Sequence, residues 1–267
     1  MSEGAPQAVV TGASAGIGAA LARRLAEAGW DLVLVARRAE RLEALAAELR
    51  GVHGRQVEVV AVDVCDPAAP AQVLARAPRL QVLVNNAGAG KFGPALGQSV
   101  EDQAAQVRLN CESLTRFTLE ALPRLVERGG GVVLNLASIA GFQPVPYFAV
   151  YAASKAYVLS FSQALDGEVA ERGVRVVAVC PGPVPTEFQS LAGSPDARES
   201  GAAWMRTPEQ VAESCLRAIQ RPRRVVTPAA IHGWVRWCYR LLPESTVVSM
   251  AGKGMKKRIV KQRGPGA

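Results

Sequence analysis

The sequence contains few residues of the kinds that hold metal ions or cross-link a chain. Of its 267 residues only two are histidine and five are cysteine. His53 and His232 are isolated from each other, so each is expected at the surface or in ordinary packing. The cysteines are odd in number, widely spaced and free of any CxxC pair, at Cys65, Cys111, Cys180, Cys215 and Cys238. This pattern predicts reduced core thiols of a cytosolic protein and no metal site.

Long apolar runs are also missing. No stretch approaches the roughly eighteen consecutive apolar residues of a membrane-spanning helix. The segment Met1–Gln7 has neither a basic stretch nor an apolar core of signal-peptide length. We therefore expect a cytoplasmic protein without a transmembrane helix.

Acidic residues are almost absent from the last part of the chain. From Arg221 to Ala267 there are eleven basic residues and one acidic residue, a net charge of +10, whereas the preceding 220 residues balance at −2. The segment Ile231–Leu242 mixes aromatic residues with arginine, and a basic cluster follows at Lys253–Lys261. Two interpretations remain: peripheral contact with an anionic membrane, or a helix docked on the body or on a second subunit. Nucleic-acid binding is not expected, because no recognised binding module accompanies the basic residues.

The rest of the chain alternates between short apolar runs and stretches with helical spacing. Runs of strand length occur at 8–10, 32–35, 57–62, 82–84, 132–136 and 174–179, and helical stretches near 16–28, 38–50, 101–127 and 149–172. This alternation predicts an α/β fold, a doubly wound parallel sheet with helices on both faces. We expect one catalytic domain over 1–228 and a basic, amphipathic C-terminal extension over 229–267.

Two helix starts carry local signals. Asp66 before Pro67 predicts an N-cap followed by a proline in the first turn. The segment Thr207–Gln210 predicts a capping box with Pro208 at the first helical position.

A glycine-rich turn, Thr11–Gly18, follows the first apolar run and precedes a helical stretch. Gly12, Gly16 and Gly18 would let the backbone bend tightly and approach a pyrophosphate, which the helix N-terminus attracts. The spacing GxxxGxG departs from the GxGxxG dinucleotide fingerprint. A structural helix-entry loop is the alternative, but the position after the first strand favours a cofactor site.

Tyr151 and Lys155 lie one helical turn apart, so a phenol and an ammonium group are expected side by side. A nearby positive charge would favour the phenolate and make the tyrosine useful in proton transfer. Alone, the pair could equally be an amphipathic helix with a surface lysine. Ser138, thirteen residues upstream, and Asn110 strengthen the catalytic interpretation. Taken singly, these two could be a strand-end turn residue and a polar residue bonding inside a helix.

Taken together, these motifs resemble the short-chain dehydrogenase/reductase family over roughly the first 190 residues. TGASAGIG at Thr11–Gly18 resembles the cofactor turn of the family, NNAG at Asn85–Gly88 its segment after the fourth strand, and PGPVPT at Pro181–Thr186 its PGxxxT loop. The resemblance implies a Rossmann-type fold and the catalytic set Asn110, Ser138, Tyr151 and Lys155. It also implies cofactor contacts at Gly12, Ser14, Gly16, Ile17, Gly18, Asp63, Val64, Asn86, Ala87, Gly88, Tyr151, Lys155, Pro181, Gly182, Val184 and Thr186, with Asp63 and Val64 flanking the adenine.

The end of the second strand predicts which nicotinamide cofactor is used. An acidic residue there would accept hydrogen bonds from the adenosine ribose and repel a 2′-phosphate. This chain has Arg37 and Arg38 instead, whose guanidinium groups can bind that phosphate. A solvated helix start is the alternative, but similarity to NADP-preferring family members favours NADP(H) and Arg37 especially.

The predicted function is an NADPH-dependent carbonyl reductase, equivalently a reversible alcohol dehydrogenase. Tyr151 would be the general acid and Ser138 would orient the carbonyl, because charge develops on its oxygen as hydride arrives. Lys155 would lower the pKa of Tyr151 and hold the nicotinamide ribose. By family resemblance, Asn110 would hold a water that links the lysine to solvent. The alternative is a cofactor-binding regulatory or membrane-surface protein that keeps the fold.

Apolar residues near the expected pocket favour an apolar carbonyl substrate, lipid-like or aromatic. They are Phe92, Phe142, Pro144, Val145, Pro146, Tyr147, Phe148, Phe188, Leu191, Trp204 and Met205. Ordinary core packing is the alternative, and it would account for about half of them. The segment Val184–Arg206, rich in glycine, serine and charge, is consistent with a mobile lid. Family resemblance implies a homo-oligomer, a dimer or tetramer, although the unusual tail puts the usual tetramer contacts in doubt.

Overall fold

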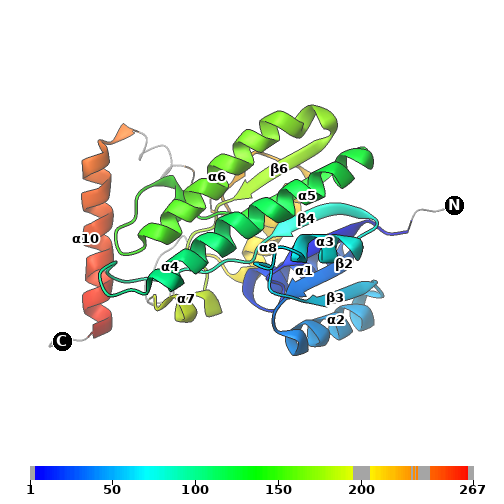
Figure 1. Ribbon diagram of the computed structural model, residues 1–267, viewed down its shortest axis with the longest axis horizontal. Coiled ribbons are helices and arrows are strands. Elements are labelled where there is room, and N and C mark those ends of the chain that lie inside the picture. Colours follow the sequence, from blue (N-terminus) through cyan, green and yellow to red (C-terminus); the bar gives the residue numbers. More distant parts are fainter. Residues whose placement is uncertain (1–3, 195–204, 230, 232, 234–240, 264–267) are drawn as a thin grey trace.

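The computed structural model describes residues 4–194, 205–229, 231, 233 and 241–263. Its strands form a seven-stranded sheet in the order β3-β2-β1-β4-β5-β6-β7, with every neighbouring pair parallel (Figure 1). The strands are β1 (Gln7–Thr11), β2 (Asp31–Ala36), β3 (Val57–Ala61), β4 (Leu80–Asn85), β5 (Gly131–Leu136), β6 (Val174–Val179) and β7 (Val225–Val226). The strand order reverses between β1 and β4, which opens a crevice at their carboxyl ends. The predicted Rossmann-type sheet is confirmed.

Helices cover both faces of the sheet, because side chains of successive strand residues point to opposite faces. In β1, Ala8 and Val10 pack in the core formed with α1, α2 and α8, whereas Val9 packs in the core formed with α3, α5 and α6. The described helices are α1 (Gly16–Glu27), α2 (Ala39–His53), α3 (Ala69–Ala75), α4 (Val100–Val107), α5 (Leu114–Glu127), α6 (Ala149–Val169), α7 (Glu187–Ala192), α8 (Pro208–Gln220) and α10 (Glu244–Arg263). Burial on both faces explains why the strands are continuous apolar runs in the sequence.

The helix predicted over 101–127 is interrupted in its middle. α4 ends at Val107, α5 begins at Leu114, and Arg108–Ser113 between them forms a π-helix. Asn110 lies in this wider turn and is buried. Such π-turns inside a helix frequently occur at functional sites.

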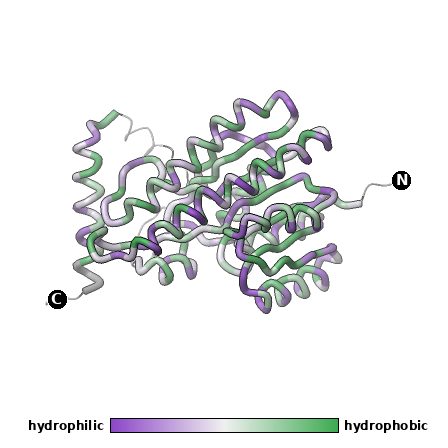
Figure 2. The backbone as a smooth tube through the Cα atoms, in the orientation of Figure 1, coloured by the Kyte–Doolittle hydropathy of each residue, from purple (hydrophilic) through white to green (hydrophobic). Residues whose placement is uncertain are grey.

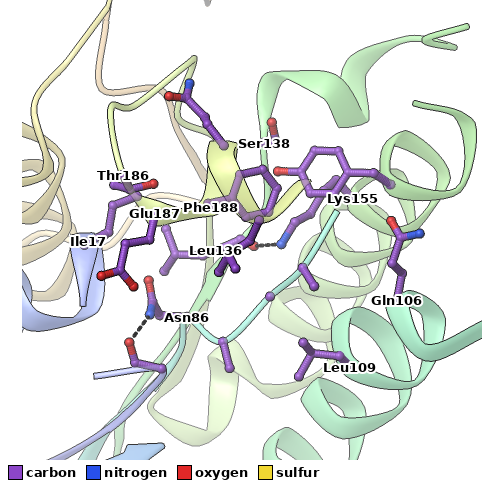
Figure 3. A pocket seen from close by; sticks show the side chains of 18 of the residues that line it. Ile17, Asn86, Gln106, Leu109, Leu136, Ser138, Lys155, Thr186, Glu187 and Phe188 are labelled. Atoms are coloured by element: carbon purple, nitrogen blue, oxygen red, sulfur yellow. Dashed lines mark hydrogen bonds between the residues drawn. The ribbon is translucent and has the colours of Figure 1, made fainter. Parts of the chain in front are cut away.

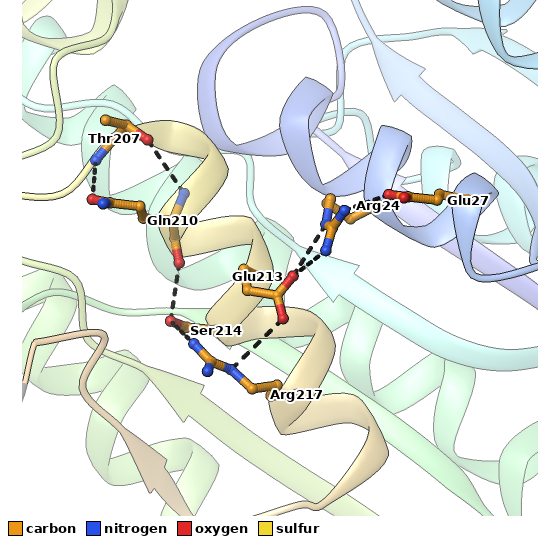
Figure 4. Close-up of polar contacts among 7 residues, drawn as sticks. All are labelled: Arg24, Glu27, Thr207, Gln210, Glu213, Ser214 and Arg217. Carbon is orange, nitrogen blue, oxygen red and sulfur yellow. Dashed lines mark hydrogen bonds and ion pairs between the residues drawn. The ribbon is translucent and has the colours of Figure 1, made fainter. Parts of the chain in front are cut away.

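One of the two predicted helix starts is wrong and the other is confirmed. α3 begins at Ala69 rather than at Pro67, because Asp66 caps a tight turn before the helix and accepts a hydrogen bond from the Ala68 N–H at 2.8 Å. At α8, Thr207 and Gln210 form the full capping box (Figure 4).

Charged side chains join α1 to α8 at the surface. Figure 4 shows Arg24 of α1 bound to Glu27 on its own helix and to Glu213 of α8, which also faces Arg217. Such half-exposed ion pairs stabilise a protein by about 1 kcal/mol or less each. Apolar packing between the two helices therefore dominates their contact.

Asp166 of α6 fastens the last two strands and was not singled out by the sequence. Its fully buried carboxylate accepts hydrogen bonds from Arg175 at 2.8 Å, from Arg224 at 2.9 Å and from the Val176 N–H at 3.0 Å. Burial by itself would raise the pKa of Asp166, but these hydrogen bonds lower it to about 2. Arg224 directly precedes β7, a two-residue strand that no apolar run predicted.

The C-terminal helix α10 lies at one end of the molecule, away from most of the sheet (Figure 1). Val247 is buried, and Gly252 lies against Pro146, whose Cγ would be 3.4 Å from a Cβ added to that glycine. In Figure 2 the core strands are mostly apolar, whereas α10 alternates between apolar and polar colours. No helix among the described residues is long and apolar enough to cross a membrane.

The described cysteines are only partly core residues. Cys180 and Cys215 are buried, as predicted, but Cys65 and Cys111 are half-buried, and none of the four is in a disulfide. Cys238 and His232 lie outside the described residues, as do Trp234, Trp237 and Tyr239.

Candidate active site

A cavity of about 910 Å³ lies at the carboxyl ends of the strands, over the crevice between β1 and β4 (Figure 3). It brings together most of the predicted site residues. Those that line it are Gly12, Ser14, Gly16, Ile17, Arg37, Arg38, Asp63, Val64, Asn86, Ala87, Gly88, Ser138, Tyr151, Lys155, Pro181, Gly182, Val184 and Thr186. Gly18 and Asn110 do not line the cavity. They contact residues that do, Gly12 and Ala89 respectively.

The glycine turn after β1 can be built only from glycine at two positions. A Cβ on Gly12, which has φ +67°, would lie 2.7 Å from Asn86 Nδ2. A Cβ on Gly18 would lie 2.4 Å from the Gly12 carbonyl oxygen. Asn86 locks this turn, since its Nδ2 donates to the Thr11 carbonyl at 2.9 Å. The N-terminus of α1 therefore opens directly into the cavity, as a pyrophosphate site requires.

Guanidinium groups gather where β2 ends. Arg37 and Arg38 line the cavity, and Arg38 donates to Ser14 Oγ at 3.0 Å. Arg41, one helical turn further along α2, joins them through Glu187: its Nη1 donates to Glu187 Oε1 at 2.6 Å, and Arg38 Nη1 donates to Oε2 at 2.7 Å. Arg41 was not predicted from the sequence, although its i+3 spacing from Arg38 could have indicated it. This end of the cavity fits a phosphate group.

Ser138, Tyr151 and Lys155 form a cluster at the opposite end. Ser138 follows β5, and Tyr151 and Lys155 project from α6. Ser138 lies close enough to Tyr151 to lower the pKa of its phenol in part, and Lys155 Nζ lies 5.8 Å from the centre of the tyrosine ring. Lys155 is buried and donates to the Leu136 carbonyl at 2.7 Å (Figure 3). The three predicted side chains thus meet around one point of the cavity.

Burial controls the protonation of this cluster. It raises the pKa of Tyr151 to about 12, although the hydrogen bond with Ser138 lowers it in part. It lowers the pKa of Lys155 to about 8, so the side chain is still mainly an ammonium at pH 7. Burial thus raises the pKa of Tyr151 where the sequence predicted a lowering by Lys155, and the lysine is not among the groups that shift this pKa.

Asn110 acts on its neighbours rather than on the cavity. Its Oδ1 accepts from the Ala89 N–H at 3.0 Å, and its Nδ2 donates to the Ala89 carbonyl at 2.8 Å and to Ser154 Oγ at 2.9 Å. These bonds fasten the loop after β4 to the turn of α6 that carries Tyr151 and Lys155. Its role in holding a water stays a prediction.

Aromatic rings surround Tyr151. Phe148 stacks on it with ring centroids 4.3 Å apart, Phe188 lies at 5.3 Å, and Phe92 contacts Phe148 edge to face. A Cβ at Gly90 would lie 2.8 Å from Phe188 Cζ and 2.9 Å from Phe148 Cζ, so any larger residue would require these rings to move.

The substrate wall is partly as predicted. Phe92, Val145, Phe148, Phe188 and Leu191 line the cavity, whereas Phe142, Pro144, Pro146, Tyr147 and Met205 do not. These five predictions are wrong: Phe142, for example, packs against the core cluster that contains Leu114, and Pro146 lies against Gly252. Trp204 lies outside the described residues, as does 195–204 of the predicted lid. Sequence reasoning missed Gln106 and Leu109, from the α4 region, and Met255 of α10.

Comparison with known proteins agrees with this geometry. A family model described as short chain dehydrogenase matches residues 6–196. Sulfoacetaldehyde reductase 2 of Chromohalobacter salexigens is 38% identical over 79% of this chain and 85% of its own length. Very-long-chain 3-oxoacyl-CoA reductase of Anas platyrhynchos is 31% identical over 96% of this chain and 83% of its own length. Among solved structures, a short-chain dehydrogenase from Sphingobium yanoikuyae in complex with NADPH is 34% identical, with a TM-score of 0.77 over 90% of this chain and 97% of that one.

A parallel sheet whose strand order reverses, with a glycine-rich turn at the crevice where it reverses, defines a Rossmann-type dinucleotide-binding protein. The chain belongs to the short chain dehydrogenase family. Members of this family are oxidoreductases that act on CH–OH or carbonyl groups.

Proposed function

We propose that this protein is an NADPH-dependent reductase of apolar ketones or aldehydes, with Tyr151 as the general acid. One observation carries the proposal: the Ser138–Tyr151–Lys155 cluster shares a single cavity with the glycine turn and the guanidinium groups after β2. A cofactor bound along this cavity would extend from the phosphate-binding end to the proton donor. A pure binding protein would not need the buried cluster.

NADP(H) is the cofactor that the adenosine end favours. Three arginines lie there, Arg37, Arg38 and Arg41, and the similar protein from Sphingobium yanoikuyae binds NADPH. A 2′-phosphate carries up to two negative charges, so guanidinium groups discriminate it strongly from a ribose hydroxyl. When bound, the nicotinamide ring supplies the hydride.

Tyr151 holds the proton that the proposed reaction needs. With a pKa of about 12, the phenol is fully protonated at neutral pH. As hydride reaches the carbonyl carbon, the Tyr151 proton passes to the carbonyl oxygen and an alcohol is formed. Ser138 lines the same cavity beside Tyr151 and is placed to donate to the same oxygen and to orient the carbonyl.

Lys155 has two proposed tasks. Its buried ammonium supplies a positive charge 5.8 Å from the centre of the Tyr151 ring once the proton has left, and its remaining N–H groups are available for a ribose hydroxyl. Leu136, whose carbonyl accepts one of these N–H groups, fixes the lysine in this position.

The substrate end favours a large apolar carbonyl compound. Phe92, Phe148, Phe188 and Leu191 line it, and Met255 adds a wall from α10. The similarity to the very-long-chain 3-oxoacyl-CoA reductase covers 96% of this chain and so extends into the C-terminal region, whereas that to the sulfoacetaldehyde reductase covers 79%. A lipid-like or aromatic ketone fits these walls better than a small polar aldehyde.

Replacement of one hydroxyl tests the proposal. Tyr151→Phe should keep NADPH binding but slow the reduction of an aryl ketone by at least about a hundredfold, the scale of a lost general acid. Tyr157→Phe is the matched control, because Tyr157 lies on the same helix, is 42% exposed and bonds only Thr115 in the described structure. Turnover of Tyr151→Phe within tenfold of wild type would remove Tyr151 from the mechanism.

The C-terminal region carries two further predictions. Val247 is buried and Met255 lines the cavity, which favours a helix α10 docked on the body, whereas Lys253, Lys256 and Lys257 are exposed and can meet an anionic membrane. Peripheral membrane contact predicts binding to vesicles that grows with acidic lipid content and weakens with salt. Vesicle co-sedimentation without such binding would end that prediction.

Homo-oligomer formation is a separate prediction that rests on family resemblance, and light scattering measures it.

A further inference from the structure

A carboxylate of the protein itself occupies two of the three guanidinium groups after β2. Glu187 accepts from Arg38 at 2.7 Å through one oxygen and from Arg41 at 2.6 Å through the other. The pKa of Glu187 is lowered by these two hydrogen bonds, from Arg41 and from Arg38, so it is ionised at neutral pH. Glu187 also lines the cavity, at the end where Ser14 binds Arg38.

Glu187 is the first residue of α7, and this short helix reaches the other end of the cavity. The next residue, Phe188, packs on the ring of Tyr151 at 5.3 Å and closes over Gly90. The last residue, Ala192, accepts from the Phe92 N–H at 2.8 Å. Before α7, the Thr186 side chain lies against Gly16, since a Cβ there would be 3.1 Å from Thr186 Cγ2. One helix thus spans from the arginines to the proposed acid.

We propose that Glu187 is an internal competitor for the 2′-phosphate subsite, and that displacing it couples the 2′-phosphate to the position of α7. This inference rests on the proposed NADPH-dependent function. A phosphate monoester carries nearly twice the charge of a carboxylate and has three acceptor oxygens. It can therefore replace Glu187 as the ion-pair partner of Arg38 and Arg41. A cofactor without the 2′-phosphate leaves both ion pairs in place. Phe188 then stays packed over Tyr151, which makes Glu187 a specificity-determining residue at both ends of the cavity.

Calorimetry with fragments of the cofactor tests the competition without any turnover. The probes are adenosine 2′,5′-bisphosphate and adenosine 5′-monophosphate, each titrated into wild type, Glu187→Gln and Glu48→Gln. Glu187→Gln should bind the bisphosphate about fivefold tighter or more, the scale of two half-exposed ion pairs, and the monophosphate within about twofold of wild type. Glu48 is the matched control, because it pairs with Arg23 through two hydrogen bonds on the same helix as Arg41 but away from the cavity. Glu48→Gln should bind both probes like wild type.

Hydrogen exchange of residues 187–192 tests the coupling to α7. In wild type, exchange should rise with saturating bisphosphate and stay constant with monophosphate. In Glu187→Gln it should be high already and respond to neither. Tighter binding without any exchange change would overturn the coupling.

The failures can be told apart. If wild type prefers the bisphosphate and Glu187→Gln binds it equally well or more weakly, Glu187 is no competitor and the inference falls while the NADPH assignment stands. If wild type binds the two probes alike, the NADPH assignment itself is wrong and the inference falls with it.

Discussion

The body of the molecule and its C-terminal helix differ in burial and in charge. In the body, strands such as β1 and β5 are buried on both faces, and the 220 residues before Arg221 carry a net charge of −2. Helix α10 buries one face through Val247 and leaves Lys253, Lys256 and Lys257 in solvent. The candidate active-site residues lie in the body, whereas the excess positive charge of the chain lies in the C-terminal region. The basic character of the chain therefore says nothing about its reaction.

The two regions nevertheless share the substrate cavity. Every proposed catalytic and phosphate-binding side chain comes from the body, and Met255 of α10 adds an apolar wall. We infer a division of roles. Residues of the body determine cofactor specificity and supply the proton, whereas α10 forms part of the wall of the substrate pocket.

The largest effect is expected at Lys155. Lys155→Ala should lower turnover by at least about a hundredfold and also weaken NADPH, because the variant loses the charge beside Tyr151 and the proposed ribose contact. Lys253→Ala, on exposed α10, should change neither. Steady-state kinetics and cofactor titration give both values. An unchanged cofactor Kd for Lys155→Ala would remove the ribose contact.

Cofactor choice should respond next. Replacing Arg37 and Arg38 together by alanine should weaken NADPH by about 1.5–3 kcal/mol for each lost charged hydrogen bond and leave NADH nearly unchanged. Fluorescence titration with both cofactors measures this. Equal losses for both, or a wild-type preference for NADH, would contradict the assignment. Arg41 remains in the double variant, so some preference for NADPH should persist.

Stability of the body should depend on Asp166. Asp166→Ala should lower the free energy of unfolding by about 2–3 kcal/mol, because it leaves the buried Val176 N–H without its acceptor and breaks two ion pairs. Glu168→Ala, exposed on the same helix, should stay within about 0.5 kcal/mol of wild type. Urea denaturation measures both, and equal stability of the two variants would contradict the role of Asp166.

The lowered pKa of Asp166 also sets a pH dependence. Its folded pKa is about 2, below the value of about 3.9 for an unfolded aspartate. Its contribution is complete above the unfolded value and is lost as pH falls through that window. Wild type should therefore lose more stability than Asp166→Ala between about pH 4 and pH 2, and identical losses would argue against the shift.

The smallest effect is expected from α10. Met255→Ala should lower kcat/KM about tenfold for a ketone that fits the wild-type cavity and less for a bulkier one, because it removes one apolar wall. Met250→Ala is the control, since that side chain is 58% exposed on the same helix and does not line the cavity. If both variants behave like wild type toward a series of ketones, α10 does not shape the substrate site.

Local patterns explain what the sequence could predict. Tyr151 and Lys155 lie on one helix, and Gly12 and Gly18 lie in one turn, so spacing alone places each pair. The ion pairs of Glu187 with Arg38 and Arg41 join residues 149 and 146 positions apart, and no spacing rule predicts such contacts.

Met255 and β7 could not be predicted for related reasons. Met255 reaches the cavity only through the way α10 docks on the body. β7 has two residues and depends on its pairing with β6 rather than on an apolar run. The pKa of Tyr151 likewise follows from tertiary burial, which the helical spacing of a nearby lysine does not report.

A double-mutant cycle of Arg37→Ala and Met255→Ala tests the division of roles most directly. Arg37 belongs to the phosphate end and Met255 to α10, and neither is bound to Glu187 in the described structure. With kcat/KM for NADPH and for a bulky aryl ketone as readouts, each change should affect its own ligand, and the two losses should add within about 0.5 kcal/mol. A coupling energy above about 1 kcal/mol would contradict the account, because the cofactor end and the α10 wall would then act as one unit.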